Sequence, residues 1–180
     1  NAREVFLEAK DAPTKYWGCK CEGISEQKLC ELIACMKDAG KETFLETLAI
    51  NEETCLKIAH LGAKCGVDHL LGTVYFDSVK KVCDDAGIAY SPFIGLDPVD
   101  TRLRGTVKDI VVDAKAIEAK DVWGISLSGF RYVNGEPSEL ICSVGQVLHK
   151  PMILAGSVNS YEKLDVIRKV PNLFAFTIGG

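Results

Sequence analysis

Short apolar stretches rich in β-branched and aromatic residues alternate along the chain with stretches whose apolar residues recur at helical spacing. The first pattern predicts strands and the second predicts amphipathic helices. A helix is expected over residues 25–38, for example, because four apolar residues fall on one of its faces. These residues are Leu29, Leu32, Ile33 and Met36. The expected strands are 16–22, 43–50, 67–73, 88–95, 122–128, 151–155 and 173–178.

The predicted elements repeat in the order strand then helix, and strands that alternate with helices in this way lie parallel. Two architectures use such repeats, an open doubly wound sheet and a closed eight-stranded barrel. The ends of the chain favour the barrel, because residues 3–10 have the pattern of a helix that follows a first strand and Gly180 stands where a closing helix is expected. We therefore predict a single α/β domain over residues 1–180, a parallel (β/α)8 barrel that lacks its first strand and its last helix. An open seven-stranded sheet is the alternative, although no glycine-rich dinucleotide motif follows the first strand.

The composition fits one globular domain, because 47% of the 180 residues are hydrophobic and 26% are charged. No apolar run approaches the ~18 residues of a membrane span, and the first residues lack the basic start and apolar centre of a signal peptide. The net charge of −4 comes without a cluster of lysine and arginine, which disfavours a nucleic-acid partner. The sequence thus predicts a cytoplasmic protein that binds neither membranes nor nucleic acids.

Eight cysteines raise the question of a disulfide framework. Disulfide scaffolds are small and loop-rich, whereas this composition can build an ordinary core, so we expect all eight thiols to be reduced. Cys19 and Cys21 are too close together for the usual zinc spacing and are expected beneath the helices. Cys30, Cys55 and Cys83 occupy apolar positions of predicted helices, where cysteine behaves as a small buried hydrophobe.

Two glycine turns stand at the carboxyl ends of the last two predicted strands, which is where barrels place their chemistry. Residues 155–157 (Ala-Gly-Ser) end one strand, and residues 177–180 (Thr-Ile-Gly-Gly) end the next. Glycine lets the backbone approach an anion closely, and the N–H groups at the start of a following helix point toward it. The pair of turns therefore predicts a phosphate-binding site.

Residues 153–157 (Ile-Leu-Ala-Gly-Ser) and 176–180 (Phe-Thr-Ile-Gly-Gly) resemble the end of the ribulose-phosphate-binding and aldolase-type barrels. That group includes hexulose-phosphate synthase, keto-deoxy-phosphogluconate aldolase and the phosphate-sensing glycerol antiterminators. Over the rest of the chain the similarity is one of architecture. The resemblance implies a small phosphorylated metabolite, a sugar or sugar-acid phosphate, whose phosphate is held by Gly156, Ser157, Gly179 and Gly180.

The catalytic motifs of that group are missing here. Its aldolases keep a Schiff-base lysine on the sixth strand, and residues 123–128 contain no lysine. Its decarboxylases and synthases carry Asp-x-Lys-x-x-Asp on the third strand, where residues 44–48 read Phe-Leu-Glu-Thr-Leu. Two interpretations stay open, a lyase or isomerase that acts on the metabolite and a catalytically silent barrel that senses it.

Charged residues on two strands are the candidate catalytic groups. Alternation along the strand 16–22 places Lys20 and Glu22 on one face, which we expect inside the barrel, and Glu46 lies near the end of the next strand. Burying such charges costs several kcal/mol unless they pair or bind a ligand. Lys20 is the candidate Schiff-base former or acid/base, while Glu22 and Glu46 could relay protons or hold Mg²⁺ or Mn²⁺. The alternative is a buried structural ion pair between Lys20 and Glu46.

The end of the sixth predicted strand supplies the remaining candidates. Arg131 and Ser126 are the expected clamp for an anionic substrate, with a solvated arginine as the alternative for Arg131. A serine nucleophile is not expected, because the second glycine of a hydrolase elbow is missing after residue 126. A homodimer is the expected assembly.

Overall fold

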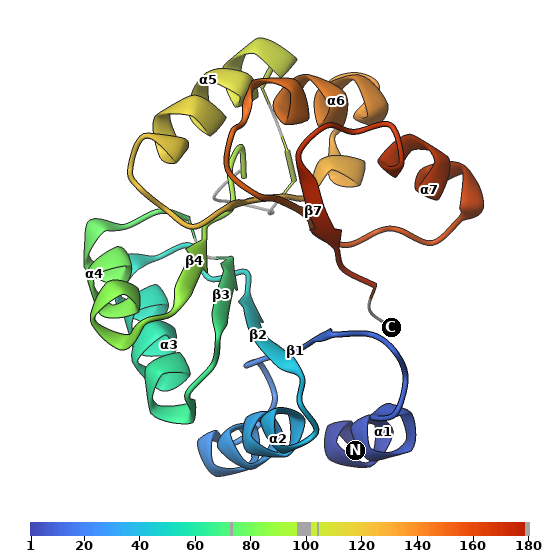
Figure 1. The fold of residues 1–180 in the computed structure, drawn as a ribbon. Coiled ribbons are helices and arrows are strands. Elements are labelled where there is room, and N and C mark those ends of the chain that lie inside the picture. Colours follow the sequence, from blue (N-terminus) through green and yellow to red (C-terminus); the bar gives the residue numbers. More distant parts are fainter. Residues whose placement is uncertain (73, 97–101, 104, 179–180) are drawn as a thin grey trace. The chain divides into compact units, whose positions relative to one another are not determined.

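The computed structural model of the protein describes residues 1–72, 74–96, 102–103 and 105–178. Helices and strands alternate in the order expected from the sequence (Figure 1). The strands are β1 (Tyr16–Lys20), β2 (Glu42–Thr47), β3 (His69–Gly72), β4 (Ala89–Ser91), β5 (Ile125–Leu127), β6 (Met152–Leu154) and β7 (Leu173–Phe176). The helices are α1 (Ala2–Ala9), α2 (Glu26–Asp38), α3 (Glu52–Cys65), α4 (Asp77–Ala86), α5 (Val107–Glu118), α6 (Pro137–Val147) and α7 (Tyr161–Ile167). A 3-10 helix that the sequence did not predict, η1 (Gly129–Arg131), follows β5.

Local side chains fix where several helices begin and end. The starting residues of five helices each accept a hydrogen bond from an N–H of the first turn, and they are Asn1, Ser25, Asn51, Thr106 and Ser160. Gly66 and Gly87 end α3 and α4 in the left-handed conformation that glycine adopts without strain. Among the described residues, no helix is both long enough and apolar enough to cross a bilayer.

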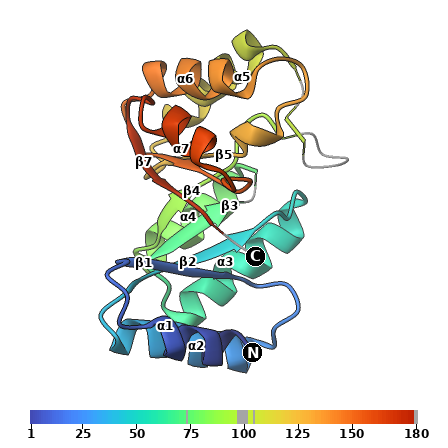
Figure 2. The ribbon, with the colours of Figure 1, turned by 90° about the vertical axis from the view of Figure 1, so that its right-hand side faces the viewer.

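The chain divides into two compact units, residues 1–90 and 91–180. In the first unit, β1 pairs in parallel with β2 and β2 pairs in parallel with β3. The face of α2 that the spacing predicted is buried, as are the inward residues of α3. Helices α1 and α2 lie side by side (Figure 2), and Phe6 of α1 packs edge-on against Trp17 of β1 at 5.1 Å between ring centroids. The expectation of a single domain over residues 1–180 stays a prediction.

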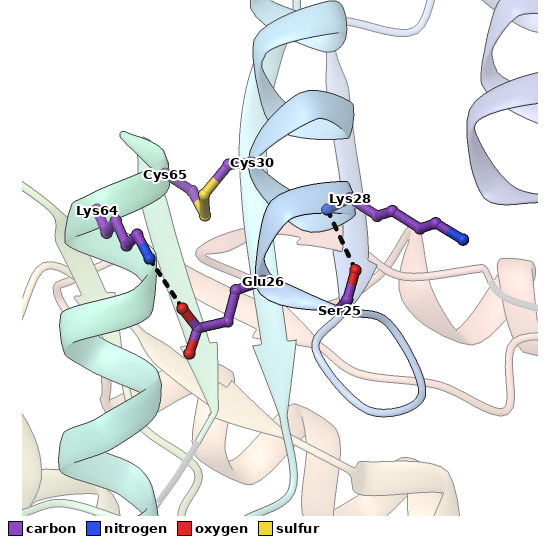
Figure 3. The surroundings of a disulfide bond; sticks show 6 residues. All are labelled: Ser25, Glu26, Lys28, Cys30, Lys64 and Cys65. Carbon is purple, nitrogen blue, oxygen red and sulfur yellow. Dashed lines mark hydrogen bonds and ion pairs between the residues drawn. A yellow bond between two sulfur atoms is a disulfide. The ribbon is translucent and has the colours of Figure 1, made fainter.

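The expectation of eight reduced thiols is wrong, because Cys30 of α2 and Cys65 at the end of α3 form a disulfide (Figure 3). Their Cα atoms are 4.5 Å apart although 35 positions separate them in the sequence. Composition gave no sign of this pair, since only the packing of α2 against α3 brings the two residues together. Disulfides are rare in the cytosol. The cytoplasmic location expected from the sequence stays a prediction.

Six cysteines remain free, and their environments differ. Cys55 and Cys83 are buried, as the helical pattern predicted. Cys19 lies half-buried on β1, where burial raises the pKa of its thiol to about 11. Cys21 is also half-buried but follows the end of β1.

The second unit contains a parallel sheet in the order β5, β6, β7, with β6 in the middle. Helices α5 and α6 lie side by side (Figure 2), and Leu140, Ile141 and Val144 of α6 are buried. The strands are shorter than expected, since β6 ends at Leu154 and β7 at Phe176. The first predicted glycine turn, and Thr177 and Ile178 of the second, therefore lie beyond strand ends. Gly179 and Gly180 fall outside the described residues.

Candidate functional site

The loop after β6 makes a left-handed turn at two consecutive residues, Gly156 with φ 73° and Ser157 with φ 60°. A glycine adopts this conformation without strain, whereas for serine it costs ~1–2 kcal/mol. Apart from its two chain neighbours, no described residue has an atom within 4 Å of the position that a Cβ would take on Gly156. Strain of this kind is often retained at ligand sites, and the open space leaves the backbone accessible to a ligand.

The sequence predicted that the N–H of Gly156 is available to bind phosphate. In the structure it donates to the Thr177 hydroxyl at 2.8 Å. Thr177 follows β7, and its own N–H donates to the carbonyl of Leu154 at 2.9 Å. This pair of bonds joins the ends of β6 and β7. The Gly156 amide is thus engaged within the protein, and a direct bond from it to phosphate would require the bond to Thr177 to break.

Other N–H groups of the turn remain available. None of the described residues accepts a hydrogen bond from the N–H of Ser157 or from that of Val158. Backbone N–H groups in such turns form concave sites that bind anions. Helix α7 begins four residues later but has only seven residues, so these amides, rather than a helix dipole, are the main donors here.

A lysine that the sequence analysis did not single out holds this loop. The ammonium of Lys163, on α7, donates to the Ser157 carbonyl at 2.6 Å and to the Asn159 side-chain oxygen at 2.8 Å. It also lies 5.0 Å from the centroid of the Phe130 ring. No sequence signal connects Lys163 to the turn, because a lysine in a helix is ordinarily a solvated charge. The structure gives the loop a positive group.

The predicted clamp residues lie within β5 and in η1. Arg131 is exposed in η1, which leaves its guanidinium in solvent. Ser126 is fully buried, and its hydroxyl donates to the Ser91 carbonyl at 2.7 Å. A hydroxyl has one proton to donate, and Ser126 donates it to a backbone carbonyl, so the hydroxyl cannot also donate to a substrate in this geometry. The clamp role stays a prediction for both residues, and the burial of Ser126 gives it no support.

In the first unit, the structure places Lys20 and Glu46 opposite each other in the register of β1 and β2. Lys20 is exposed and forms no hydrogen bond or ion pair with the described residues. The alternative of a buried Lys20–Glu46 ion pair is therefore wrong. Glu46 is half-buried, on the face of the sheet that also carries Phe44.

Glu22 does not share that face, in contrast to the prediction. Strand β1 ends at Lys20, so Glu22 lies in a turn, where its carboxylate accepts a hydrogen bond from Thr47 at 3.0 Å. Thr47 and Glu46 are neighbours on β2 and point to opposite faces of the sheet. The geometry consequently draws the carboxylates of Glu22 and Glu46 apart and does not fit a Mg²⁺ or Mn²⁺ shared by them. Within the described ranges, no three His, Cys, Asp or Glu residues are grouped so that they could hold a metal ion.

His69 received no role from the sequence, and the structure places it at the start of β3. Its Nε2 lies 2.6 Å from a carboxylate oxygen of Glu42, whose other oxygen pairs with Lys15 at 2.7 Å. The ring stacks on Phe44 at 4.0 Å between centroids. The bonds from Lys15 and then His69 hold the pKa of Glu42 below its ordinary value. This cluster lies at the amino ends of β2 and β3. Barrel enzymes place their active sites at the opposite, carboxyl ends of the strands, so we expect the cluster to stabilise the fold.

Comparisons with known proteins bear on the fold. No protein-family model matches the chain, and no curated protein sequence is significantly similar to it. Solved structures do match. The orotidine 5′-phosphate decarboxylase of Pyrococcus horikoshii OT3 is 15% identical with a TM-score of 0.70, covering 98% of this chain and 82% of its own.

Two further structures are an antiterminator and an aldolase, and both kinds of protein were named by the resemblance. The glycerol uptake operon antiterminator regulatory protein of Listeria monocytogenes is 15% identical with a TM-score of 0.65, over 99% of this chain and 88% of its own. The 4-hydroxy-2-oxoglutarate/2-dehydro-3-deoxyphosphogluconate aldolase from TTHB1 is 15% identical with a TM-score of 0.63, over 97% and 74%. At these identities the likeness concerns the fold. The chain therefore has the parallel (β/α)-barrel fold of these structures, as the resemblance in its sequence implied.

Proposed function

We propose that this protein binds the phosphate group of a small phosphorylated metabolite, a sugar or sugar-acid phosphate, at the carboxyl ends of β6 and β7. The observation that carries the proposal is the left-handed turn at Gly156 and Ser157, which leaves the N–H groups of Ser157 and Val158 without an acceptor among the described residues. Similar structures include proteins named for phosphorylated sugar acids and nucleotides, which supports this class of ligand.

The charge around the turn favours an anion over a cation. Residues 153–160 contain no acidic side chain, and the Lys163 ammonium bonds to the carbonyl of Ser157. Because a trans peptide directs its C=O and N–H to opposite sides, this bond turns the Val158 N–H away from the ammonium. Polarisation of the peptide by the ammonium also makes that N–H a stronger donor. The proposal also includes Gly179 and Gly180 as phosphate-binding residues, because the resemblance to the ribulose-phosphate-binding barrels implies this role for them.

The reaction that we propose is that of a lyase or isomerase, with Lys20 and Glu46 as candidate groups. An exposed amine at the end of β1 that pairs with no described residue is accessible to a carbonyl substrate. The alternative is a barrel that senses a metabolite without turning it over, and the likeness to an antiterminator regulatory protein favours this second function. A homodimer and a cytoplasmic location stay predictions.

Binding is tested by adding inorganic phosphate to the ¹⁵N-labelled protein and following the amide resonances. We expect the amides of Ser157 and Val158 to shift saturably, while those of β2 in the first unit stay in place. Sodium chloride at equal ionic strength is the control, since it screens charges without supplying a tetrahedral oxyanion. Resonances of the turn that respond equally to both salts would contradict the proposed site.

Catalysis is tested with Lys20→Met, which keeps the length of the side chain and removes its charge. If the parent converts a sugar phosphate, the variant should lose this activity. It should keep the parent's affinity for inorganic phosphate, because the anion is held by other residues. Its melting temperature should stay within ~1 °C of the parent, because exposed charges contribute little stability. Lys28→Met, on the exposed surface of α2, is the matched control. A Lys20→Met protein as active as the parent would exclude this role, and a parent inactive on every sugar phosphate would favour the sensor.

A further inference from the structure

Thr177 belongs to the second predicted glycine turn, but the sequence analysis gave its side chain no role. Its Oγ1 accepts the N–H of Gly156 at 2.8 Å, and its backbone N–H donates to Leu154 at 2.9 Å. The residue is thus fixed from two sides at the ends of two adjacent strands. The amide expected to bind phosphate delivers its hydrogen bond to this hydroxyl instead.

A threonine hydroxyl offers one proton as well as its acceptor sites. Within the part of the chain that the structure describes, no group accepts that proton from Thr177. A hydroxyl that accepts a hydrogen bond from an amide becomes a better donor, because the two bonds polarise each other. Thr177 can therefore pass the donor character of the Gly156 amide on to a ligand.

The surroundings determine what kind of ligand could take this proton. The loop between β6 and α7 has no carboxylate of its own, and the Lys163 ammonium is bonded to its backbone. An acceptor from outside the protein is thus favoured when it carries negative charge. The N–H groups of Ser157 and Val158 and the hydroxyl of Thr177 make three donors, which match the three terminal oxygens of a phosphate monoester better than the two of a carboxylate.

We propose that Thr177 is a phosphate-binding residue, whose hydroxyl accepts from the Gly156 amide and donates to a terminal oxygen of a phosphate monoester. This inference rests on the proposed function. It adds one residue that binds the phosphate, and it specifies a phosphate monoester as the group that the site binds. The Gly156 amide then acts on the phosphate through Thr177 rather than directly.

The test compares two variants of this hydroxyl by calorimetric titration with inorganic phosphate and with glycerol 3-phosphate as a monoester probe. Thr177→Val keeps the shape and removes the hydroxyl, and it should weaken binding of both probes about tenfold or more. Thr177→Ser restores the hydroxyl and should bind within about threefold of the parent. Thr106→Val is the matched control, because Thr106 caps α5 through its hydroxyl in the same unit. It should lose stability and keep its affinity.

The outcomes separate this inference from the proposed function. If the parent binds phosphate and Thr177→Val binds it equally well, the role of Thr177 is refuted and the site stands. If the parent binds neither probe, the proposed function fails and the inference fails with it. Should Thr177→Val not fold, the labelled parent decides: on addition of phosphate the Thr177 methyl and the Gly156 amide must shift together with Ser157. A shift of Ser157 alone would overturn the inference.

Discussion

Replacing Cys30 and Cys65 by serine should lower the free energy of unfolding by about 4 kcal/mol. In the chain-entropy description, a disulfide stabilises by restricting the unfolded chain, and the gain grows with the logarithm of the loop that it closes. The bond joins Cys30 of α2 to Cys65 of α3 and so closes a loop in which the two residues are 35 positions apart. That length gives ~13 cal/mol/K of lost entropy in the unfolded chain, which is ~4 kcal/mol at 25 °C. The ion pair between Glu26 and Lys64 beside the bond (Figure 3) is exposed and adds little.

The assay has a chemical part and a thermodynamic part. In denaturant without reductant, six thiols should react, and eight should react after reduction. The count must be made on denatured protein, because burial raises the pKa of Cys83 to about 12 and slows its reaction in the folded state. Urea denaturation of the parent and the double variant then gives the difference in stability, and a decrease in melting temperature of ~8–16 °C is expected.

Cys35→Ser is the matched control, because Cys35 lies on the same helix with a free thiol that is also half-buried. It should change the stability by less than ~1 kcal/mol. Adding reductant should bring the parent to the stability of the double variant and leave that variant unchanged. Eight reactive thiols in denatured, unreduced protein would refute the disulfide. A double variant as stable as the oxidised parent would refute the entropic reasoning.

Three further predictions concern the second unit. Ser157→Gly should raise the free energy of unfolding by ~0.5–1 kcal/mol in urea denaturation, because glycine removes the left-handed strain; a loss of stability would contradict the strain. Lys163→Met should speed amide hydrogen exchange over the turn and weaken phosphate binding several-fold, whereas Lys169→Met, an exposed lysine past α7, should do neither. Burial alone would raise the pKa of Glu118, but the backbone N–H groups of residues 149 and 150 outweigh it and hold that pKa below its ordinary value. A lowered folded-state pKa gives stability that is present above the unfolded value of ~4.3 and is lost as the pH falls through the folded value. Glu118→Gln should therefore cost ~1 kcal/mol at pH 7 and nothing at pH 2, and a difference independent of pH would exclude this linkage.

The pattern of apolar residues determined the helices, the parallel strands and their order. Helix α2 buries the four residues that its spacing placed on one face, and α3 begins directly after Asn51, whose side chain caps it. Such features depend on residues within a few positions of one another, so the sequence carries them directly. The glycine turn after β6 belongs to the same class, because strand ends and turn residues are local.

The tertiary structure decided which distant residues meet. The Cys30–Cys65 disulfide follows from how two helices pack, and the bond from Gly156 to Thr177 follows from the pairing of β6 with β7. The end of β1 at Lys20, two residues earlier than predicted, took Glu22 off the face that alternation assigned to it. Contacts between residues 20 or more positions apart depend on packing across the whole unit, and periodicity within a single element holds no information about them.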